Sequence, residues 1–130
     1  MVATLVSAGL CGLVFFWLSI RVVQVRLSAK VALGDGGDAA LLSRIRAHAN
    51  FAEYVPLMLV MMLAIELSLK ATPLTLWAPA LGLPILRLLH ATGMERPAPN
   101  PYRAAGAVGT WALLAGLSVW ALVLALRFGV

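Results

Sequence analysis

A short polar segment, Arg46-Ala47-His48-Ala49-Asn50-Phe51-Ala52-Glu53-Tyr54, leads directly into a long apolar run. A helix turns by about 100° per residue, so Asn50 and Glu53 lie within roughly 40° of Arg46 and form one polar stripe with it. The rise from Arg46 to Glu53 is about 10 Å, close to the span of an extended tripeptide. Guanidinium groups bind carboxylates, and a glutamate binds an ammonium group. The stripe therefore indicates a site for a small peptide with charges of both signs.

The elements that carry this stripe are predicted to be membrane helices. Of the 130 residues, 62% are apolar and only 12% are charged. Four apolar segments have the length of a membrane span, at about 2–20, 51–69, 73–94 and 104–126. We expect an all-α integral membrane four-helix bundle, one domain over 1–130 with helices at about 2–30, 39–69, 73–94 and 103–127. The first segment has no basic start and no A-x-A cleavage site, which favours a retained helix over a signal peptide.

The basic residues of this chain predict its orientation. The net charge is +5, and most Lys and Arg side chains lie in or beside the first and third connections between helices. The positive-inside rule then places both termini outside and these two connections in the cytoplasm, as for a bacterial inner-membrane protein. Basic residues at the ends of membrane helices indicate contact with membrane lipid, not with nucleic acid.

Capping residues and prolines predict local features of these helices. Asp38 and Thr72 are suited to cap the second and third helices, and Glu66 and Lys70 are expected to pair on the outer side. Three prolines predict a kink in the second helix and two disturbances in the third: Pro56, Pro79 and Pro84. Arg44 and His48 point away from the polar stripe and are expected among lipid headgroups. Small residues four apart allow close helix packing, at Ala8 and Gly12, Ala105 and Gly109, and Ala112 and Gly116.

In this topology, polar side chains from all four helices collect at the cytoplasmic end: Arg26, Arg46, Asn50, Glu53, Arg87, His90 and Arg103. One interpretation is an ion-pair lock in which Glu53 holds one arginine. That lock leaves other arginines without an acid at a rim of low dielectric, which favours an anionic ligand. Metal binding is a poor alternative, because His48 and His90 are the only histidines and lie on different helices. No Ser, His and acid are spaced for a hydrolytic triad.

The polar segment resembles the signature of the MAPEG family, membrane-associated proteins in eicosanoid and glutathione metabolism. The resemblance rests on Arg46-Ala47-His48-Ala49-Asn50-x-x-Glu53-Tyr54-x-Pro56 and covers essentially the whole chain. Gln24-Val25-Arg26-Leu27 also resembles the end of the first helix in the prostaglandin E synthase branch. Arg87-x-x-His90 and Arg103 stand where that branch keeps an arginine, a histidine and the arginine that faces the glutathione sulfur.

This resemblance implies a homotrimer with glutathione bound between neighbouring subunits. It implies a glutathione-dependent transferase or peroxidase that acts on lipophilic electrophiles or hydroperoxides. The residues carried over to glutathione binding are Arg26, Arg46, Asn50, Glu53, Tyr54, Arg87 and His90. Arg103 would be the catalytic residue that stabilises the thiolate, with the positive end of its helix behind it.

The chain departs from its relatives at three positions. Met94 stands where many relatives have a tyrosine, so no hydroxyl can reach the sulfur from there. Ala104 and Ala49 replace a serine and an arginine of the prostaglandin branch. These differences argue against prostaglandin isomerisation and leave thiolate chemistry on other lipophilic compounds. A small proton-coupled multidrug transporter, or a non-catalytic scaffold of the same fold, are the competing hypotheses.

Overall fold

A computed structural model describes residues 1–128 of the chain. Its elements are α1 (Val2–Ala29), α2 (Ala39–Leu69), a short 3-10 turn η1 (Leu74–Leu76), α3 (Trp77–Met94) and α4 (Pro101–Phe128). Four helical segments are long and apolar enough to cross a membrane, and no strand occurs within the described part of the chain. The prediction of an all-α protein with four such helices is therefore confirmed.

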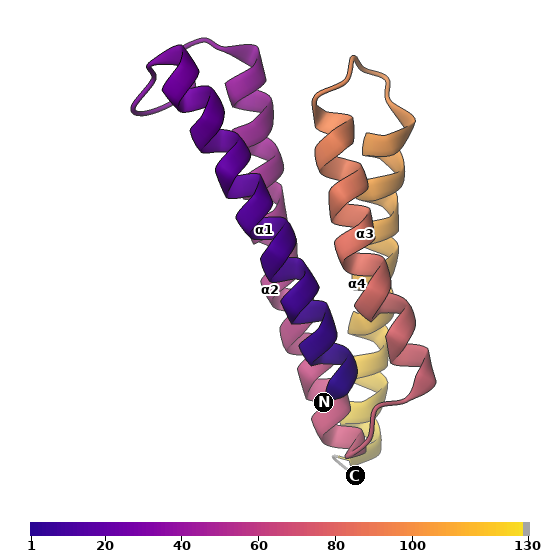
Figure 1. Cartoon of the computed structure of the whole chain (residues 1–130). Coiled ribbons are helices and arrows are strands. Elements are labelled where there is room, and N and C mark those ends of the chain that lie inside the picture. Colours follow the sequence, from indigo (N-terminus) through magenta and orange to yellow (C-terminus); the bar gives the residue numbers. More distant parts are fainter. Residues whose placement is uncertain (129–130) are drawn as a thin grey trace.

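The helices form two antiparallel hairpins, α1 with α2 and α3 with α4, and α1 also packs against α3. Figure 1 shows that the hairpins lie close together near the N-terminus and separate toward their two connections. We call the first region the Glu66 end and the second the Arg103 end. A cavity lies between α2 and the α3–α4 hairpin near the Arg103 end.

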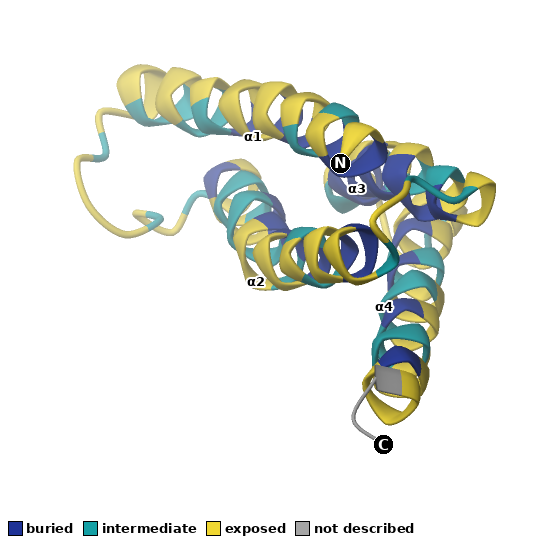
Figure 2. Cartoon of the chain, turned by 90° about the horizontal axis from the view of Figure 1, so that it is seen from below, coloured by how far each residue is buried: buried dark blue, intermediate teal, exposed yellow. Residues whose placement is uncertain are grey.

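The core is a set of apolar side chains on the inward faces of the helices (Figure 2). It includes Val14, Leu18, Met58, Met62 and Leu83. Large apolar side chains also cover the outward faces, where they are exposed, as Leu5, Leu13, Phe16, Val60 and Leu122 are. A bundle that is apolar both inside and outside is suited to a bilayer, because lipid tails solvate the outer side chains.

The ends of α1 and α2 show how the sequence sets their lengths. The Asp38 carboxylate accepts a hydrogen bond from the Leu41 N–H at 2.9 Å and caps α2, as predicted. Lys30 and Lys70 end α1 and α2 in the left-handed conformation, with φ of 55° and 51°. The Arg26 guanidinium donates to the Gly34 carbonyl at 2.8 Å, so it fastens the chain that leaves α1.

The Glu66 end differs from the prediction at two residues. Glu66 does not pair with Lys70; its carboxylate accepts hydrogen bonds from the Ala3 N–H at 3.2 Å and the Thr4 N–H at 3.0 Å. The Thr72 hydroxyl donates to Glu66 at 2.6 Å and does not cap the third helix. The unpaired N–H groups in the first turn of α1 attract a carboxylate more strongly than an exposed lysine does.

The prolines do not break their helices. α3 is continuous from Trp77 to Met94 through both Pro79 and Pro84, so neither proline ends the helix, and the two disturbances stay predictions. Pro79 lies in the first turn of α3, where its missing N–H would have no partner in the helix. α2 likewise continues through Pro56.

Glycines bring α3 and α4 into backbone contact. A Cβ on Gly106 would lie 2.5 Å from the backbone nitrogen of His90, and one on Gly93 would overlap the backbone of Arg103. Gly109 similarly leaves no space beside Leu86, so the close packing predicted there is confirmed. A Cβ on Gly12 or Gly116 would meet no described atom within 4 Å. The two helices of the α3–α4 hairpin therefore lie closer together than they could if side chains stood between them.

Candidate functional site

A cavity of about 460 Å³ lies near the Arg103 end, between α2, α3, α4 and the α3–α4 connection. This volume is typical of small-molecule sites. Its lining contains no Asp or Glu and consists of Asn50, Tyr54, Arg87, His90, Ala98, Pro99, Asn100, Arg103, Ala104, Ala107 and Trp111. Five residues predicted from the sequence therefore meet around one cavity: Asn50, Tyr54, Arg87, His90 and Arg103.

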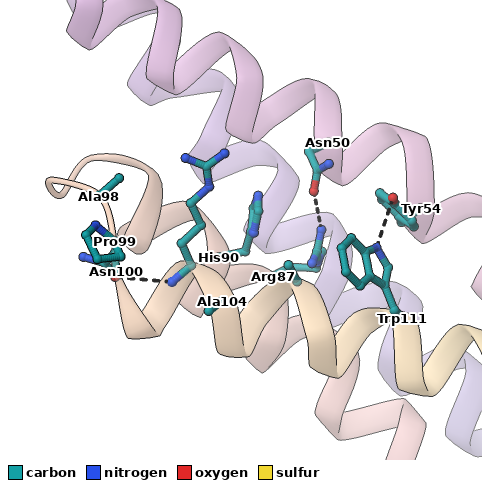
Figure 3. Close-up of a pocket in the computed structure, with 11 residues that line it drawn as sticks. Asn50, Tyr54, Arg87, His90, Ala98, Pro99, Asn100, Ala104 and Trp111 are labelled. Carbon is teal, nitrogen blue, oxygen red and sulfur yellow. Dashed lines mark hydrogen bonds between the residues drawn. The ribbon is translucent and has the colours of Figure 1, made fainter.

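Arg87 joins three helices at the floor of this cavity. Its guanidinium donates to the Asn50 side-chain oxygen at 2.7 Å, as Figure 3 shows. It also donates to the Gly106 carbonyl at 2.9 Å and to the Thr110 hydroxyl at 2.5 Å. The Thr110 hydroxyl in turn donates to Gly106 at 2.7 Å, which aims its oxygen lone pairs at the guanidinium. Neutral oxygens thus hold the charge in place without neutralising it.

Two nitrogens near this floor have no hydrogen-bond partner. Arg87 is only 2% exposed and its Nε is unpaired, and His90 is 8% exposed with Nδ1 unpaired. No ion pair in residues 1–128 includes Arg87. Buried polar groups are normally satisfied, and a buried cation is costly unless an anion or strong dipoles stabilise it. The cavity therefore offers cationic and imidazole groups that suit an anionic ligand.

Tyr54 and Trp111 form the apolar wall of the cavity. The Trp111 indole N–H donates to the Tyr54 hydroxyl at 3.2 Å, which links α4 to α2 (Figure 3). The Tyr54 ring centroid lies 5.7 Å from the Arg87 guanidinium carbon, within the range of a cation–π contact. Trp111 was not predicted from the sequence as a site residue, so its place at the cavity was missed. Its spacing from Ala104 and Ala107 on α4, at i, i+3 and i+7, was the available signal.

Arg103 lies in the first turn of α4 at the edge of the cavity. The Asn100 side-chain oxygen caps this helix by accepting from the N–H groups of Tyr102 at 3.0 Å and Arg103 at 3.3 Å. The Arg103 side chain is exposed and makes no hydrogen bond or ion pair with other described residues. A cation at the edge of the cavity with no partner among the described residues is available to a negatively charged atom of a ligand.

The other predicted site residues lie elsewhere in the chain. Arg46 pairs with Glu53 at 3.7 Å, and both side chains are exposed on the outward face of α2. Asn50 turns from them toward Arg87, so the stripe divides between two faces. Arg26 lines a separate hollow at the end of α1. The structure does not bring Arg26, Arg46 and Glu53 to the cavity.

Arg44 and His48, which were expected among lipid headgroups, both make contacts within the protein. The Arg44 side chain pairs with Glu95 at 2.8 Å. The His48 ring shares a hydrogen bond with the Ser19 hydroxyl at 3.0 Å and stacks on Phe15 with centroids 4.4 Å apart. Both side chains therefore contact other parts of the same chain. Among the residues described, no three His, Cys, Asp or Glu side chains gather to hold a metal ion.

Four apolar helices, and a cavity whose lining contains Arg87, His90 and Arg103 but no acid, define a helical membrane protein with a cavity suited to an anionic ligand. The chain belongs to the MAPEG family, whose model matches residues 4–123. It is similar to the inner membrane protein YecN of Escherichia coli K12, with 34% identity over 130 residues that cover 92% of this chain and 95% of that protein. YecN of Escherichia coli O6:H1 matches to the same extent. No solved structure matches the chain.

Proposed function

We propose that this protein is a glutathione-dependent transferase or peroxidase of the inner membrane that acts on lipophilic electrophiles or hydroperoxides. The observation that carries the proposal is the cavity with Arg87, His90 and Arg103 in its lining and no acid beside them. Glutathione has two carboxylates and a thiol, and all three gain from nearby cations when ionised. Family membership supports the same class of ligand, because the family includes glutathione-related enzymes.

In this proposal, residues of one subunit hold one side of the peptide. Arg87 and His90 face its carboxylates from the floor, and Asn50 and Tyr54 contact it from α2. The unpaired His90 Nδ1 gains a partner when the ligand is bound. Filling the cavity thus satisfies groups that are unsatisfied in the free subunit.

A homotrimer completes the proposed site. Glu53 lies on an apolar segment yet is half-exposed on the outward face of α2, paired only with Arg46. A carboxylate that faces lipid costs at least a few kcal/mol near the centre of a bilayer. A neighbouring subunit would cover this pair, and its Arg26 would reach the ligand from the end of α1. We therefore assign Arg26, Arg46 and Glu53 to a site shared between subunits, with Glu53 taking the amino group of glutathione.

Arg103 is the proposed catalytic residue. A free thiol has a pKa of about 8.5, so only a few per cent of it is ionised at neutral pH, and a nearby cation lowers that pKa. Arg103 would favour the thiolate and leave its sulfur free to attack an electrophilic carbon, with departure of a halide or opening of a ring. Met94 and Ala104 have no hydroxyl to replace this cation. The lipophilic substrate would enter from the bilayer beside Tyr54 and Trp111.

The role of Arg103 can be tested by conjugation of glutathione to an aryl halide in detergent. We expect Arg103→Ala to lower kcat about ten- to a hundredfold, since each tenfold corresponds to about 1.4 kcal/mol of lost thiolate stabilisation. Arg127→Ala, which removes an exposed arginine from the last turn of the same helix, is the matched control. A variant Arg103→Ala with the kcat of the wild type would show that Arg103 is not the activating residue.

Calorimetry and mass measurement test binding and assembly. We expect glutathione to bind the purified protein and the protein–detergent particle to contain three chains. Binding without conjugation or peroxide reduction would favour the scaffold hypothesis. Uptake of a cationic drug into vesicles, driven by a pH gradient and lost in Glu53→Gln, would favour the transporter. Failure of glutathione to bind the wild-type protein would exclude the proposed function.

A further inference from the structure

Three charged side chains from different parts of the chain meet at the Arg103 end, and we call them the Glu95 cluster: Arg21, Arg44 and Glu95. Glu95 forms ion pairs with Arg21 through one carboxylate oxygen and with Arg44 through the other, the latter at 2.8 Å. Arg44 also donates to the Arg21 carbonyl at 2.9 Å. The Arg21 guanidinium lies over the Trp17 ring, 4.3 Å from its centroid. Each member of the cluster therefore has more than one contact.

The Glu95 cluster is much better shielded from solvent than the other ion pair near this end. The side chains of Arg21, Arg44 and Glu95 are 16%, 24% and 29% exposed, against 54% and 52% for Arg46 and Glu53. An exposed pair contributes little, whereas a shielded network with two-sided pairing holds its geometry more firmly. The cluster is thus the stronger ionic link of the two.

This link joins the two hairpins where they diverge. Arg21 lies on α1 and Arg44 on α2, whereas Glu95 follows directly after α3. Beside it, the Ser43 hydroxyl of α2 donates to the Met94 carbonyl of α3 at 2.5 Å. Figure 1 shows that the hairpins are farther apart here than at the Glu66 end. The Glu95 cluster therefore opposes further separation of α2 from α3.

The Glu95 cluster is also connected to the cavity through short, stiff segments. Gly93, two residues before Glu95, packs directly against the backbone of Arg103. Ala98, Pro99 and Asn100, which follow it, line the cavity, and Asn100 caps the helix that carries Arg103. A shift of Glu95 relative to α2 would thus move the rim and Arg103 together.

We propose that Glu95 is a positioning residue that sets the width of the cavity through its pairs with Arg21 and Arg44. It places His90 and Arg103 of one hairpin at a defined distance from Asn50 and Tyr54 of the other. The effect on width is a property of the free protein, whereas its effect on glutathione rests on the proposed function.

The width can be measured without any ligand. Cysteines are introduced at two exposed positions, Leu42 of α2 and Ala105 of α4, and spin labels are attached to them. The protein also carries Cys11→Ser, so that its own free cysteine is not labelled. Labelled chains are diluted with unlabelled chains, and the distance is measured by pulsed electron paramagnetic resonance. We expect Glu95→Gln to lengthen or broaden this distance distribution. Glu53→Gln, which breaks only the exposed pair, is the control and should leave it unchanged.

A charge exchange separates loss of the link from loss of the fold. Glu95→Arg combined with Arg44→Glu keeps one acid between two cations, and we expect it to restore the wild-type distance. An unchanged spin-label distance in Glu95→Gln would overturn the proposal. A double variant that is folded by circular dichroism, but whose distance distribution is no narrower than that of Glu95→Arg alone, would also overturn it.

Activity supplies a second readout. We expect Glu95→Gln to raise the KM for glutathione about fivefold or more, equivalent to about 1 kcal/mol of binding, with kcat nearly unchanged. Arg103→Ala should instead lower kcat. If the wild-type protein does not bind glutathione, the proposed function fails while the distance measurement still decides the role of Glu95. A fall in kcat without a change in KM would contradict a positioning role.

Discussion

The two ends of the bundle treat buried charge in opposite ways. At the Glu66 end, the carboxylate is fully buried and accepts hydrogen bonds from two N–H groups of α1 and from the Thr72 hydroxyl. Toward the Arg103 end, Arg87 is equally buried but meets only neutral oxygens, and its Nε and the His90 Nδ1 have no partner. A charge whose partners are all in the protein serves stability, whereas an unsatisfied one is available to a ligand.

The Glu66 end is not free of unpaired groups, and the exceptions define the contrast. The hydroxyls of Thr4 and Ser7 are buried on α1 without partners. They are neutral, so each costs far less than an uncompensated charge. Neither residue lines the large cavity. The difference between the two ends thus lies in how their charges are compensated and in the space beside them.

The largest expected effect on stability comes from a substitution at the Glu66 end. Glu66→Ala leaves the first N–H groups of α1 without an acceptor in a buried place, and we expect it to lower the free energy of unfolding by about 3 kcal/mol. Circular dichroism during unfolding in detergent measures this loss. Ser68→Ala is the control, because Ser68 lies at an exposed position of α2, the helix that carries Glu66. A difference of less than about 0.5 kcal/mol between Glu66→Ala and wild type would remove the contrast between the ends.

An intermediate effect, on glutathione affinity more than on stability, is expected from a substitution of Arg87 toward the Arg103 end. Arg87→Met keeps an unbranched apolar stem and removes the guanidinium with its buried charge, so stability should change less than in Glu66→Ala. Glutathione affinity should fall about tenfold or more, because a charge-assisted hydrogen bond is lost. Unfolding and calorimetry on the same preparations give both numbers. If stability fell by as much as in Glu66→Ala and affinity did not change, Arg87 would be purely structural.

The smallest effect is expected at the cavity wall. Tyr54→Phe removes the acceptor of the Trp111 N–H and retains the ring, and we expect a loss of less than about 1 kcal/mol. A shift in tryptophan emission would report the altered contact. Tyr102→Phe, whose ring lies under Arg96, keeps Trp111 unchanged and is the comparison variant. A large loss of stability in Tyr54→Phe would mean that this wall supports the fold.

Much of the cavity could be predicted from helical periodicity and family resemblance. Asn50, Tyr54, Arg87, His90 and Arg103 were expected near one another, and all five line it. A helix turns by about 100° per residue, so these positions could be assigned to faces once the spans were known. Asp38 was recognised because a capping residue interacts with its own helix.

Contacts between residues far apart in the sequence could not be predicted in this way. Glu66 meets Ala3, and Glu95 meets Arg21, across separations that depend on how each helix is rotated against its neighbours. The local rule of pairing four residues apart therefore suggested Lys70 for Glu66, which was wrong. Gly93 and Gly106 were missed for the same reason, because only the packed pair of helices shows which glycines meet backbone.

The glycine contacts between α3 and α4 have a mechanical consequence. With backbone against backbone at Gly93 and Gly106, the two helices cannot slide or rotate past each other without steric overlap. The hairpin can then move relative to α2 only as one rigid unit. The Glu66 end would be the hinge, because Thr72 lies in the connection between α2 and α3 and its hydroxyl donates to Glu66. The width of the cavity would therefore depend on the angle of this hairpin rather than on the reshaping of either helix.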